Sequence, residues 1–373
     1  MTHVAVIGCG IVGAAIAYEL SLVSGLKITV LDRYPPAQRA TGAALGVLMG
    51  AISKKVKGRA WQLRQASMQR YEVLIPELEA LTKHQIPFNR NGIVMLCFTQ
   101  EDLVSWEQLA ETRRSQGWPL EIWDVAQVQS HCPQLCTEKI IGAIYSPQDR
   151  QVDPSALTKA LVIAAESNGV TFNFGVGVES LTSTNSDASG ERVCKQIHTT
   201  VEQLDVDWLV VASGLGSTLL TASLEQPVDI RPVLGQALHL QLEHPLGKPG
   251  FQPVITGDDV HIVPVSEKEY WVGATVEFAD AVGEVVAEPT NLEKVRQEAN
   301  AFCPALAEAT IVRTWSGKRP RPEGRPAPII GQLPGYSNVL LATGHYRNGI
   351  LLAPATAQAI RAMITQASGK ASH

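Results

Sequence analysis

The first forty residues consist of short apolar runs separated by glycines and polar residues. An apolar, β-branched run covers residues 3–7, apolar residues at helical spacing follow at 14–20, and a second apolar run covers 27–31. Three glycines lie between the first run and the apolar positions of the helix. The chain therefore opens with a predicted β-α-β unit.

The rest of the chain carries the same two periodicities. Helical spacing and capping residues predict helices at residues 61–81, 101–116, 153–165, 289–301 and 350–365. Apolar or alternating runs predict strands at residues 92–98, 171–174, 193–200, 207–212, 232–242, 261–264, 270–278 and 339–342. Asp153 or Ser155 is the expected N-cap of its helix. The polar stretch 182–191 predicts a loop, because it is rich in Ser, Asn, Asp and Gly.

These elements indicate two lobes, since 373 residues exceed one ordinary core. The run 207–212 is continuously apolar, as in a strand buried on both faces, and it belongs with the opening unit. The strands between residues 232 and 278 are separated by turn residues. They predict a largely antiparallel sheet in the second lobe.

Charge and cysteine usage exclude several classes of protein. A net charge of −5 argues against a broad nucleic-acid surface, and no apolar stretch approaches the roughly 20 residues that cross a bilayer. The six cysteines are scattered without a Cys-x-x-Cys pair, which favours a reducing cytoplasm. His131, Cys132 and Cys136 lie close in sequence, but we interpret these cysteines as small apolar residues and expect no metal site.

The first motif that carries chemistry is G-x-G-x-x-G at residues 8–13, placed after a strand and before a helix. Such glycines allow a tight turn and close approach of a pyrophosphate, to which the helix N-terminus presents N–H groups. Asp32 ends the second strand, where an acid binds a ribose hydroxyl, and its presence disfavours NADP. The pattern predicts a dinucleotide site, but FAD and NAD share it.

Three further segments carry a family resemblance. They are residues 39–46 (RATGAALG), 207–217 (DWLVVASGLGS) and 344–356 (GHYRNGILLAPAT). Together with the glycine motif they resemble the D-amino-acid oxidase superfamily, and most closely its glycine oxidase branch. The resemblance implies a Rossmann-type FAD-binding domain, discontinuous in sequence, with an inserted α+β substrate domain, and hence an α/β fold. The expected divisions are residues 1–85, 145–230 and 315–373 for the FAD-binding domain and 86–144 and 231–314 for the substrate domain.

The resemblance also implies which residues bind FAD. They are Gly8, Gly10, Ile11, Val12, Gly13, Asp32, Arg33, Thr41, Ala43, Ala44, Gly46, Leu48, Val178, Gly214, Gly216, Arg319, Gly344, Tyr346, Arg347, Asn348, Gly349 and Ile350. A helix that starts near Gly349 would direct its positive end at the flavin and stabilise the anionic reduced ring. No Cys lies near Arg319 of the kind that anchors flavin covalently in related sarcosine oxidases, so FAD is expected to be non-covalent.

The segment Trp315-Ser-Gly-Lys-Arg319-Pro resembles the family's Trp-x-Gly-x-Arg-Pro sequence, whose Arg holds the substrate carboxylate. A guanidinium can grip a carboxylate at two points, although a solvated loop charge is the alternative. Arg347 is the second candidate for contact with flavin or substrate, with a structural ion pair as its alternative. His261 stands where the glycine oxidase pattern has Tyr. It can donate a hydrogen bond to a carboxylate, or it can indicate that the substrate is a different amine.

The resemblance implies FAD-dependent oxidative deamination of a small amino acid or amine, with hydride transfer to flavin. The products would be keto acid or glyoxylate, ammonia and hydrogen peroxide, with molecular oxygen as the expected acceptor. An amino-acid dehydrogenase that passes electrons to a quinone, or an oxidase of a different secondary amine, remains open. So do the exact substrate and a homo-oligomeric state. A nicotinamide dehydrogenase would not need the second and third segments, and a non-catalytic flavoprotein would not need Arg319.

Overall fold

The computed structural model describes residues 1–373 except 186–189, 223, 225, 281–283 and 371–373. Its first layer is a six-stranded sheet in the order β20-β21-β13-β1-β2-β9, parallel except for β20. The strands are β1 (Thr2–Ile7), β2 (Leu26–Asp32), β9 (Thr171–Phe174), β13 (Trp208–Val211), β20 (Ile329–Gln332) and β21 (Val339–Thr343). The predicted β-α-β unit and the buried strand at 207–212 are confirmed as neighbours in this sheet.

Side chains of β1 alternate between two cores, as the period of a strand requires. Val4 and Val6 pack into the core that contains the helices, whereas Ala5 and Ile7 pack on the opposite face. The helices are α1 (Ile11–Ser21), α2 (Gly58–Thr82), α5 (Pro154–Ser167) and α8 (Gly349–Lys370). The opposite face is covered by a small antiparallel sheet of β10 (Val178–Asn185), β11 (Arg192–Thr199) and β12 (Gln203–Asp205).

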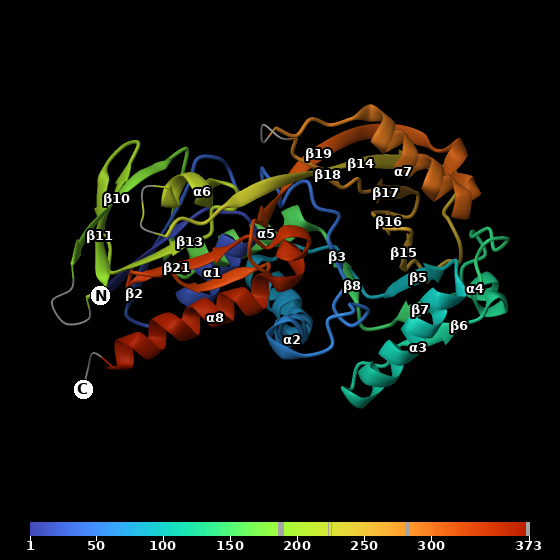
Figure 1. Cartoon of the computed structure of the whole chain (residues 1–373), viewed down its shortest axis with the longest axis horizontal. Helices are drawn as coiled ribbons and strands as arrows, with labels where there is room; N and C mark the ends of the chain where they lie inside the picture. The colour runs from blue at the N-terminus through green and yellow to red at the C-terminus, as the bar shows by residue number, and fades with distance from the viewer. Residues whose placement is uncertain (186–189, 223, 225, 281–283, 371–373) are drawn as a thin grey trace.

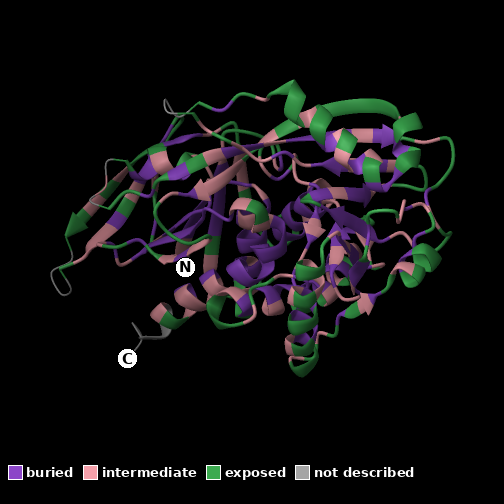
Figure 2. Ribbon diagram, turned by 45° about the vertical axis from the view of Figure 1, so that its right-hand side comes forward, coloured by how far each residue is buried: buried purple, intermediate pink, exposed green. Residues whose placement is uncertain are grey.

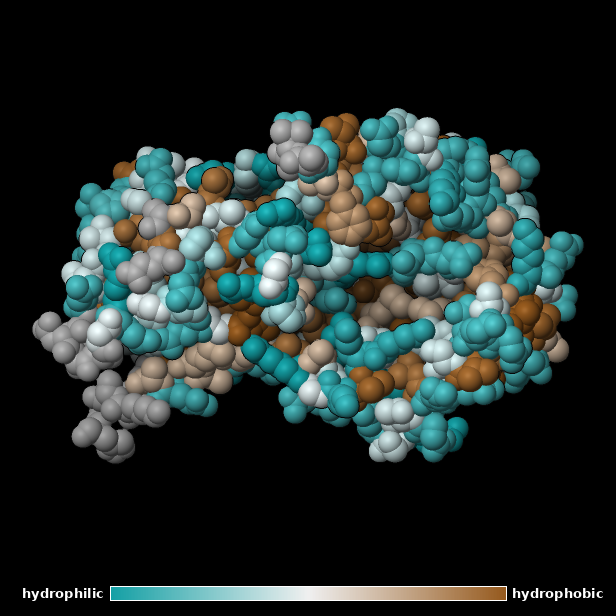
Figure 3. All heavy atoms as spheres, in the orientation of Figure 1, coloured by the Kyte–Doolittle hydropathy of each residue, from teal (hydrophilic) through white to brown (hydrophobic). Residues whose placement is uncertain are grey.

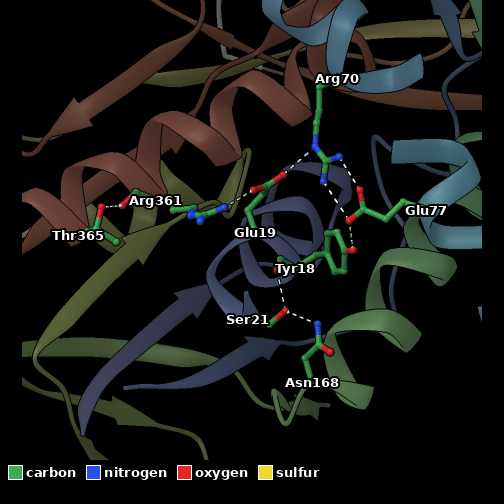
Figure 4. Close-up of polar contacts among 8 residues, drawn as sticks. All are labelled: Tyr18, Glu19, Ser21, Arg70, Glu77, Asn168, Arg361 and Thr365. Carbon is green, nitrogen blue, oxygen red and sulfur yellow. Dashed lines mark hydrogen bonds and ion pairs between the residues drawn. The ribbon is translucent and has the colours of Figure 1, made fainter. Parts of the chain in front are cut away.

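A polar network joins α1, α2 and α8 (Figure 4). Arg70 of α2 donates to Glu19 of α1 at 3.0 Å and to Glu77 of its own helix at 2.6 Å, and Arg361 of α8 reaches Glu19 at 3.3 Å. Glu19 is nearly buried. Two guanidiniums therefore compensate one buried carboxylate, which otherwise would be costly to remove from water.

The second layer is a nine-stranded sheet in the order β18-β14-β17-β16-β15-β5-β7-β6, with β19 paired to β14 (Figure 1). All its pairs are antiparallel except β15 with β5, which confirms the largely antiparallel sheet. The strands are β5 (Ile93–Cys97), β6 (Glu121–Trp123), β7 (Gly142–Ser146), β14 (Ile230–Gln241), β15 (Val254–Gly257), β16 (Val260–Pro264), β17 (Glu269–Gly273), β18 (Glu277–Phe278) and β19 (Thr310–Pro322).

One face of the nine-stranded sheet packs on helix α7 (Pro289–Phe302). Leu238, Ile262 and Val272 share a core with Val295 and Phe302 of that helix. The other face packs toward the first layer. The shorter elements are β3 (Val47–Leu48), β4 (Phe88–Asn89), β8 (Arg150–Val152), α3 (Gln100–Ser115), α4 (Val125–His131), α6 (Gly216–Thr221) and the 3-10 turns at Pro304–Glu308 and Tyr346–Asn348.

Buried residues are concentrated between and within the two layers, and exposed residues lie on the outer helices and strand edges (Figure 2). On the face drawn in Figure 3, hydrophobic residues appear in smaller areas among hydrophilic ones. Among the described residues, no helix has both the length and the apolar content needed to cross a membrane.

Most of the predicted elements are confirmed, with three main differences. Asp153 is confirmed as the N-cap of α5, because its carboxylate accepts from the N–H groups of Ser155 and Ala156 at 2.8 Å. The predicted loop 182–191 is wrong at its start, since residues 182–185 extend β10; polar side chains are tolerated there because that strand is mostly exposed. Residues 186–189 of that prediction lie outside the described residues.

The other two differences concern strands of the second layer. The predicted strand 270–278 is interrupted after Gly273, and β19 is a 13-residue strand where no strand was predicted. The expected domain divisions at 144/145 and 314/315 fall within β7 and β19. The two-domain division therefore remains a proposal.

Candidate active site

The glycine-rich turn lies between β1 and α1 at the carboxyl end of the parallel sheet. Gly8 has φ of +103°, and a Cβ there would lie 2.6 Å from the carbonyl oxygen of Ala212. Only glycine fits this close approach of two backbones. Gly10 begins α1 as an N-cap without a side-chain hydrogen bond, and Ile11, Val12 and Gly13 form the first turn. The N-cap residue therefore supplies no side-chain acceptor to the helix N-terminus, a kind of site that favours anions in general.

Asp32 lies beside this turn, at the end of β2. Its Oδ2 accepts from the N–H of Cys9 at 2.6 Å, and its Oδ1 accepts from the N–H of Tyr34 at 2.9 Å. The carboxylate therefore holds the turn. Arg33 next to it is exposed, and Val178 is buried at the start of β10 in the same core as Ile7.

The segment 41–48 runs from the glycine turn to the second layer. Thr41 Oγ1 accepts from the N–H of Ile11 at 3.0 Å, and the carbonyl of Ala43 accepts from the indole N–H of Trp315 at 3.1 Å. The N–H of Ala44 donates to Thr41, and Gly46 and Leu48 continue into the pairing of β3 with β8. Backbone from the predicted cofactor segment is thus bonded to the strand that carries Arg319.

Two more predicted segments meet at the same edge of the sheet. Gly214 and Gly216 follow β13, and the hydroxyl of Thr343, at the end of β21, donates to the carbonyl of Gly214 at 3.3 Å. Open parallel sheets bind ligands outside the carboxyl ends of their strands. The ends of β1, β13 and β21 are such an edge.

The closing motif turns sharply before α8. Gly344 and Tyr346 both have positive φ, at 67° and 52°, and the N–H of Asn348 donates to the carbonyl of His345 at 3.0 Å. Helix α8 begins at Gly349, as expected, and the carbonyl of Ile350 accepts from the buried Tyr71 hydroxyl at 2.6 Å. The helix N-terminus is therefore held against α2.

His345 in this turn is buried, and its tautomer follows from its partner. Thr356 donates its hydroxyl hydrogen to the carbonyl of Leu352 at 2.8 Å, so its oxygen accepts from Nε2 of His345 at 3.0 Å. The histidine then carries its proton on Nε2. Burial lowers the pKa of His345 to about 4, which keeps it neutral at pH 7.

Arg319, Trp315 and His261 lie on the same face of the nine-stranded sheet. Arg319 pairs with Val233 and Trp315 with Ala237 across β14 and β19, while Gly273 pairs with both Ala237 and His261. Directly paired residues project to the same face. That face is the one turned away from α7, since Ala237, Trp271 and Trp315 pack into the core of the first layer.

The guanidinium of Arg319 is fixed by backbone. Nη1 donates to the carbonyls of Leu234 at 3.1 Å and Thr275 at 3.0 Å. The group lies over Gly235, where any Cβ would collide with it. Burial, followed by the charge of Arg347, lowers the pKa of Arg319. In the part of the chain that the structure describes, the hydrogen bonds of this guanidinium are made by Nη1.

Arg347 and His261 complete the predicted group. Arg347 Nη2 lies 3.4 Å from Oδ1 of Asp259, and His261 Nδ1 lies 2.9 Å from the hydroxyl of Thr256. Burial and the charges of Arg347 and Arg319 lower the pKa of His261 to about 4, against the opposing effect of Asp259. Arg319, Arg347 and His261 therefore lie within electrostatic range of one another.

Sequence reasoning missed the partners of these residues. Thr256 and Asp259 flank His261 on the β15–β16 hairpin, and Gly235 accommodates Arg319. The Gly257-Asp258-Asp259 turn signal between two strands was visible in the sequence. Nothing local in the sequence connects Gly235 with Arg319.

The site fits a dinucleotide such as FAD. The turn at Gly8 has no room for a side chain, the N-cap Gly10 supplies no side-chain acceptor of its own, and an acid lies at the end of the second strand. Cys132, which lies close to His131 in sequence, is buried. The ring of His131 stacks on that of Trp123, with 4.5 Å between the ring centroids. Among the described residues, no three His, Cys, Asp or Glu side chains form a group that could hold a metal.

Comparison with known proteins agrees with this geometry. A family model described as DAO, FAD dependent oxidoreductase, matches residues 3–363. The chain is 32% identical over 367 residues to the bifunctional protein ThiO/ThiG of Synechocystis sp., covering 97% of this chain and 51% of that protein. It is 30% identical over 361 residues to the glycine oxidase of Bacillus subtilis, covering 96% and 92%.

The fold of the chain is also similar to the solved structures of such proteins. The glycine oxidase of Geobacillus kaustophilus superposes with a TM-score of 0.83 at 27% identity, over 98% of this chain and 95% of that one. The chain spans about half the length of the ThiO/ThiG relatives and most of the length of the glycine oxidases.

Proposed function

The chain belongs to the DAO family of FAD-dependent oxidoreductases, and we propose that it oxidises the carbon–nitrogen bond of a small, carboxylate-bearing amine such as glycine. The observation that carries the proposal is the placement of Arg319. A partly buried guanidinium, fixed by two carbonyls, presents its remaining edge on the sheet face that also carries His261. An unpaired buried cation is costly, and a substrate carboxylate would compensate it.

FAD would be held by the glycine turn, Asp32, segment 41–48 and the turn before α8. When bound, it would accept the hydride from the amine-bearing carbon, and the resulting imine would hydrolyse to glyoxylate or a keto acid and ammonia. The N-terminus of α8 would add positive potential at this end of the site.

Arg319 would bind the carboxylate side-on, through Nε and Nη2. Two parallel hydrogen bonds fix the direction of the α-carbon as well as its distance, which is what this chemistry requires of the protein. The two backbone carbonyls on Nη1 prevent the guanidinium from rotating with the ligand.

His261 would contribute hydrogen bonding without a third positive charge. Its pKa of about 4 keeps the ring neutral at pH 7, and Thr256 fixes its orientation through Nδ1. Nε2 would then be the atom that meets substrate. This role replaces that of the tyrosine in the glycine oxidase pattern.

We propose molecular oxygen as the final acceptor, with hydrogen peroxide as product. A dehydrogenase that reduces a quinone would use the same residues, as would an oxidase of a different secondary amine. Oxygen uptake on addition of substrate separates an oxidase from a dehydrogenase.

The test is anaerobic reduction of the purified, FAD-loaded protein by a panel of amines. Glycine, sarcosine, D-alanine, L-proline and iminodiacetate are each added, and loss of flavin absorbance is followed. Bleaching by at least one carboxylate-bearing amine, but not by ethylamine, is the expected result. A protein without flavin, or one whose flavin none of these amines reduces, would contradict the proposal.

A further inference from the structure

Arg347 is paired with a carboxylate supplied by the protein itself. Strands β15 and β16 are joined by a two-residue turn, Asp258-Asp259, in which both residues have positive φ, at 48° and 65°. Such turns match the twist of a hairpin and hold its tip in a defined place. The tip brings Asp259 to 3.4 Å from Nη2 of Arg347, although 88 residues separate them in the chain.

This ion pair is exposed and therefore exchangeable. The side chain of Asp259 is 75% exposed and that of Arg347 is 37% exposed. Pairs of this kind contribute little to stability, because water and salt screen them. A ligand carboxylate can consequently take the place of Asp259 on Arg347 at small cost.

The pair also lies close enough to the carboxylate anchor to matter there. Arg347 affects the electrostatics of both Arg319 and His261, and Asp259 opposes its effect at His261. The negative charge of Asp259 thus acts on Arg347 and His261, two of the three groups predicted to meet substrate. The positive charge of Arg347 is partly offset before any ligand arrives.

We propose that Asp259 is a specificity-determining residue: a built-in carboxylate that competes with the substrate carboxylate for Arg347 and disfavours ligands with a second negative charge. This inference rests on the proposed function. The substrate class it selects is a small amine with one carboxylate, because a dicarboxylate would meet Asp259 with its second charge.

The experiment uses Asp259→Asn with Asp258→Asn as its matched control. Both changes remove one negative charge from the same turn, and Asn tolerates the positive φ that the turn requires. Among the residues that the structure describes, Asp259 forms the ion pair with Arg347 and Asp258 does not. Acetate and malonate are titrated into the full-length, FAD-loaded protein, and binding is followed by flavin absorbance and by the ligand-induced rise in Tm.

Asp259→Asn is expected to bind acetate two- to fivefold more tightly, about 0.4–1 kcal/mol at 1.4 kcal/mol per tenfold, and malonate by a larger factor. Asp258→Asn is expected to behave as wild type. In an Arg347→Met background, Asp259→Asn should give no further tightening. KM for glycine should fall in Asp259→Asn while kcat stays within twofold.

A merely structural role for Asp259 would loosen binding, so the direction of the change is diagnostic. Unchanged or weaker acetate binding in Asp259→Asn, equal tightening in Asp258→Asn, or tightening that persists without Arg347 would each overturn the inference. The inference would also be overturned if neither acetate nor malonate bound to any of the variants. If acetate binding tightens as expected but no amine reduces the flavin, the proposed function fails and the inference stands.

Discussion

Asp149 and Arg113 bind the same stretch of backbone from its two hydrogen-bonding sides. The Asp149 carboxylate accepts from the N–H groups of Gly50, Ala51 and Ile52 at 2.7, 2.8 and 2.9 Å. Arg113 donates to the carbonyls of Ala51, Ser53 and Lys55 at 2.6, 2.7 and 3.0 Å. Both side chains are fully buried, and the segment they hold lies shortly after the predicted cofactor segment 39–46.

Asp149→Ala should destabilise the protein strongly. Three backbone donors would lose their acceptor in a buried place, and one unsatisfied donor costs about 1–3 kcal/mol, so a loss on the order of 3 kcal/mol is expected. Urea unfolding measures it. Asp229→Ala is the control, since it removes an exposed carboxylate paired with Arg231 and should cost less than about 1 kcal/mol. Equal losses in the two variants would contradict the structural role of Asp149.

Asp32→Ala should weaken FAD binding. The carboxylate holds the N–H of Cys9 and is placed for a ribose hydroxyl, and hydrogen bonds to a charged group contribute about 1.5–3 kcal/mol. The FAD dissociation constant should therefore rise roughly tenfold or more, measured by flavin fluorescence on dilution of the reconstituted protein. Acid precipitation should release FAD from wild type, because the cofactor is expected to be non-covalent. An unchanged FAD dissociation constant in the variant would show that Asp32 is only a surface charge.

Arg319→Lys should slow anaerobic flavin reduction by a carboxylate-bearing amine at least ~10-fold, and Arg319→Ala should slow it more. The lysine keeps the charge but loses both the two-point grip and the bonds to Leu234 and Thr275, and a misplacement near 1 Å can cost ~100-fold. FAD content should stay normal. Arg321→Lys, two residues along β19 and paired with Glu323, is the matched control and should reduce at the wild-type rate. If both variants slow equally, the anchor lies elsewhere.

The free energy of unfolding should depend on pH through two histidines, His261 and His345. Their pKa of about 4 in the folded protein lies below the unfolded value near 6.5, so the unfolded chain binds more protons in between. Stability should therefore be fully present above pH 6.5 and be lost as pH falls toward 4, by up to about 3 kcal/mol for each histidine.

His345→Gln keeps a donor for Thr356 and removes one titrating group. Urea unfolding between pH 7 and pH 5 should show a shallower loss of stability in this variant than in wild type. An identical slope in the two proteins would rule out His345 as a source of the dependence.

The sequence by itself determined the parts of this protein whose geometry is local. A glycine turn between a strand and a helix, the Asp at the end of the next strand, and the turn before α8 lie within a few residues of the groups they shape. Backbone sterics at Gly8 and capping at Asp153 depend on near neighbours, so their spacing could be read directly. Apolar or alternating runs likewise predicted most strands of the first layer and β5, β14, β16 and β17 of the second, whereas β6, β7, β15, β19 and β20 were not predicted.

Only the tertiary structure decided what surrounds the candidate carboxylate anchor. Arg319 meets the carbonyl of Leu234 across 85 residues, and Arg347 meets Asp259 across 88. These two contacts depend on the register of β14 with β19 and on the position of the β15–β16 turn. A shift of β19 by one residue would turn Arg319 toward α7, because successive side chains of a strand point to opposite faces, and no local pattern in the sequence specifies that register.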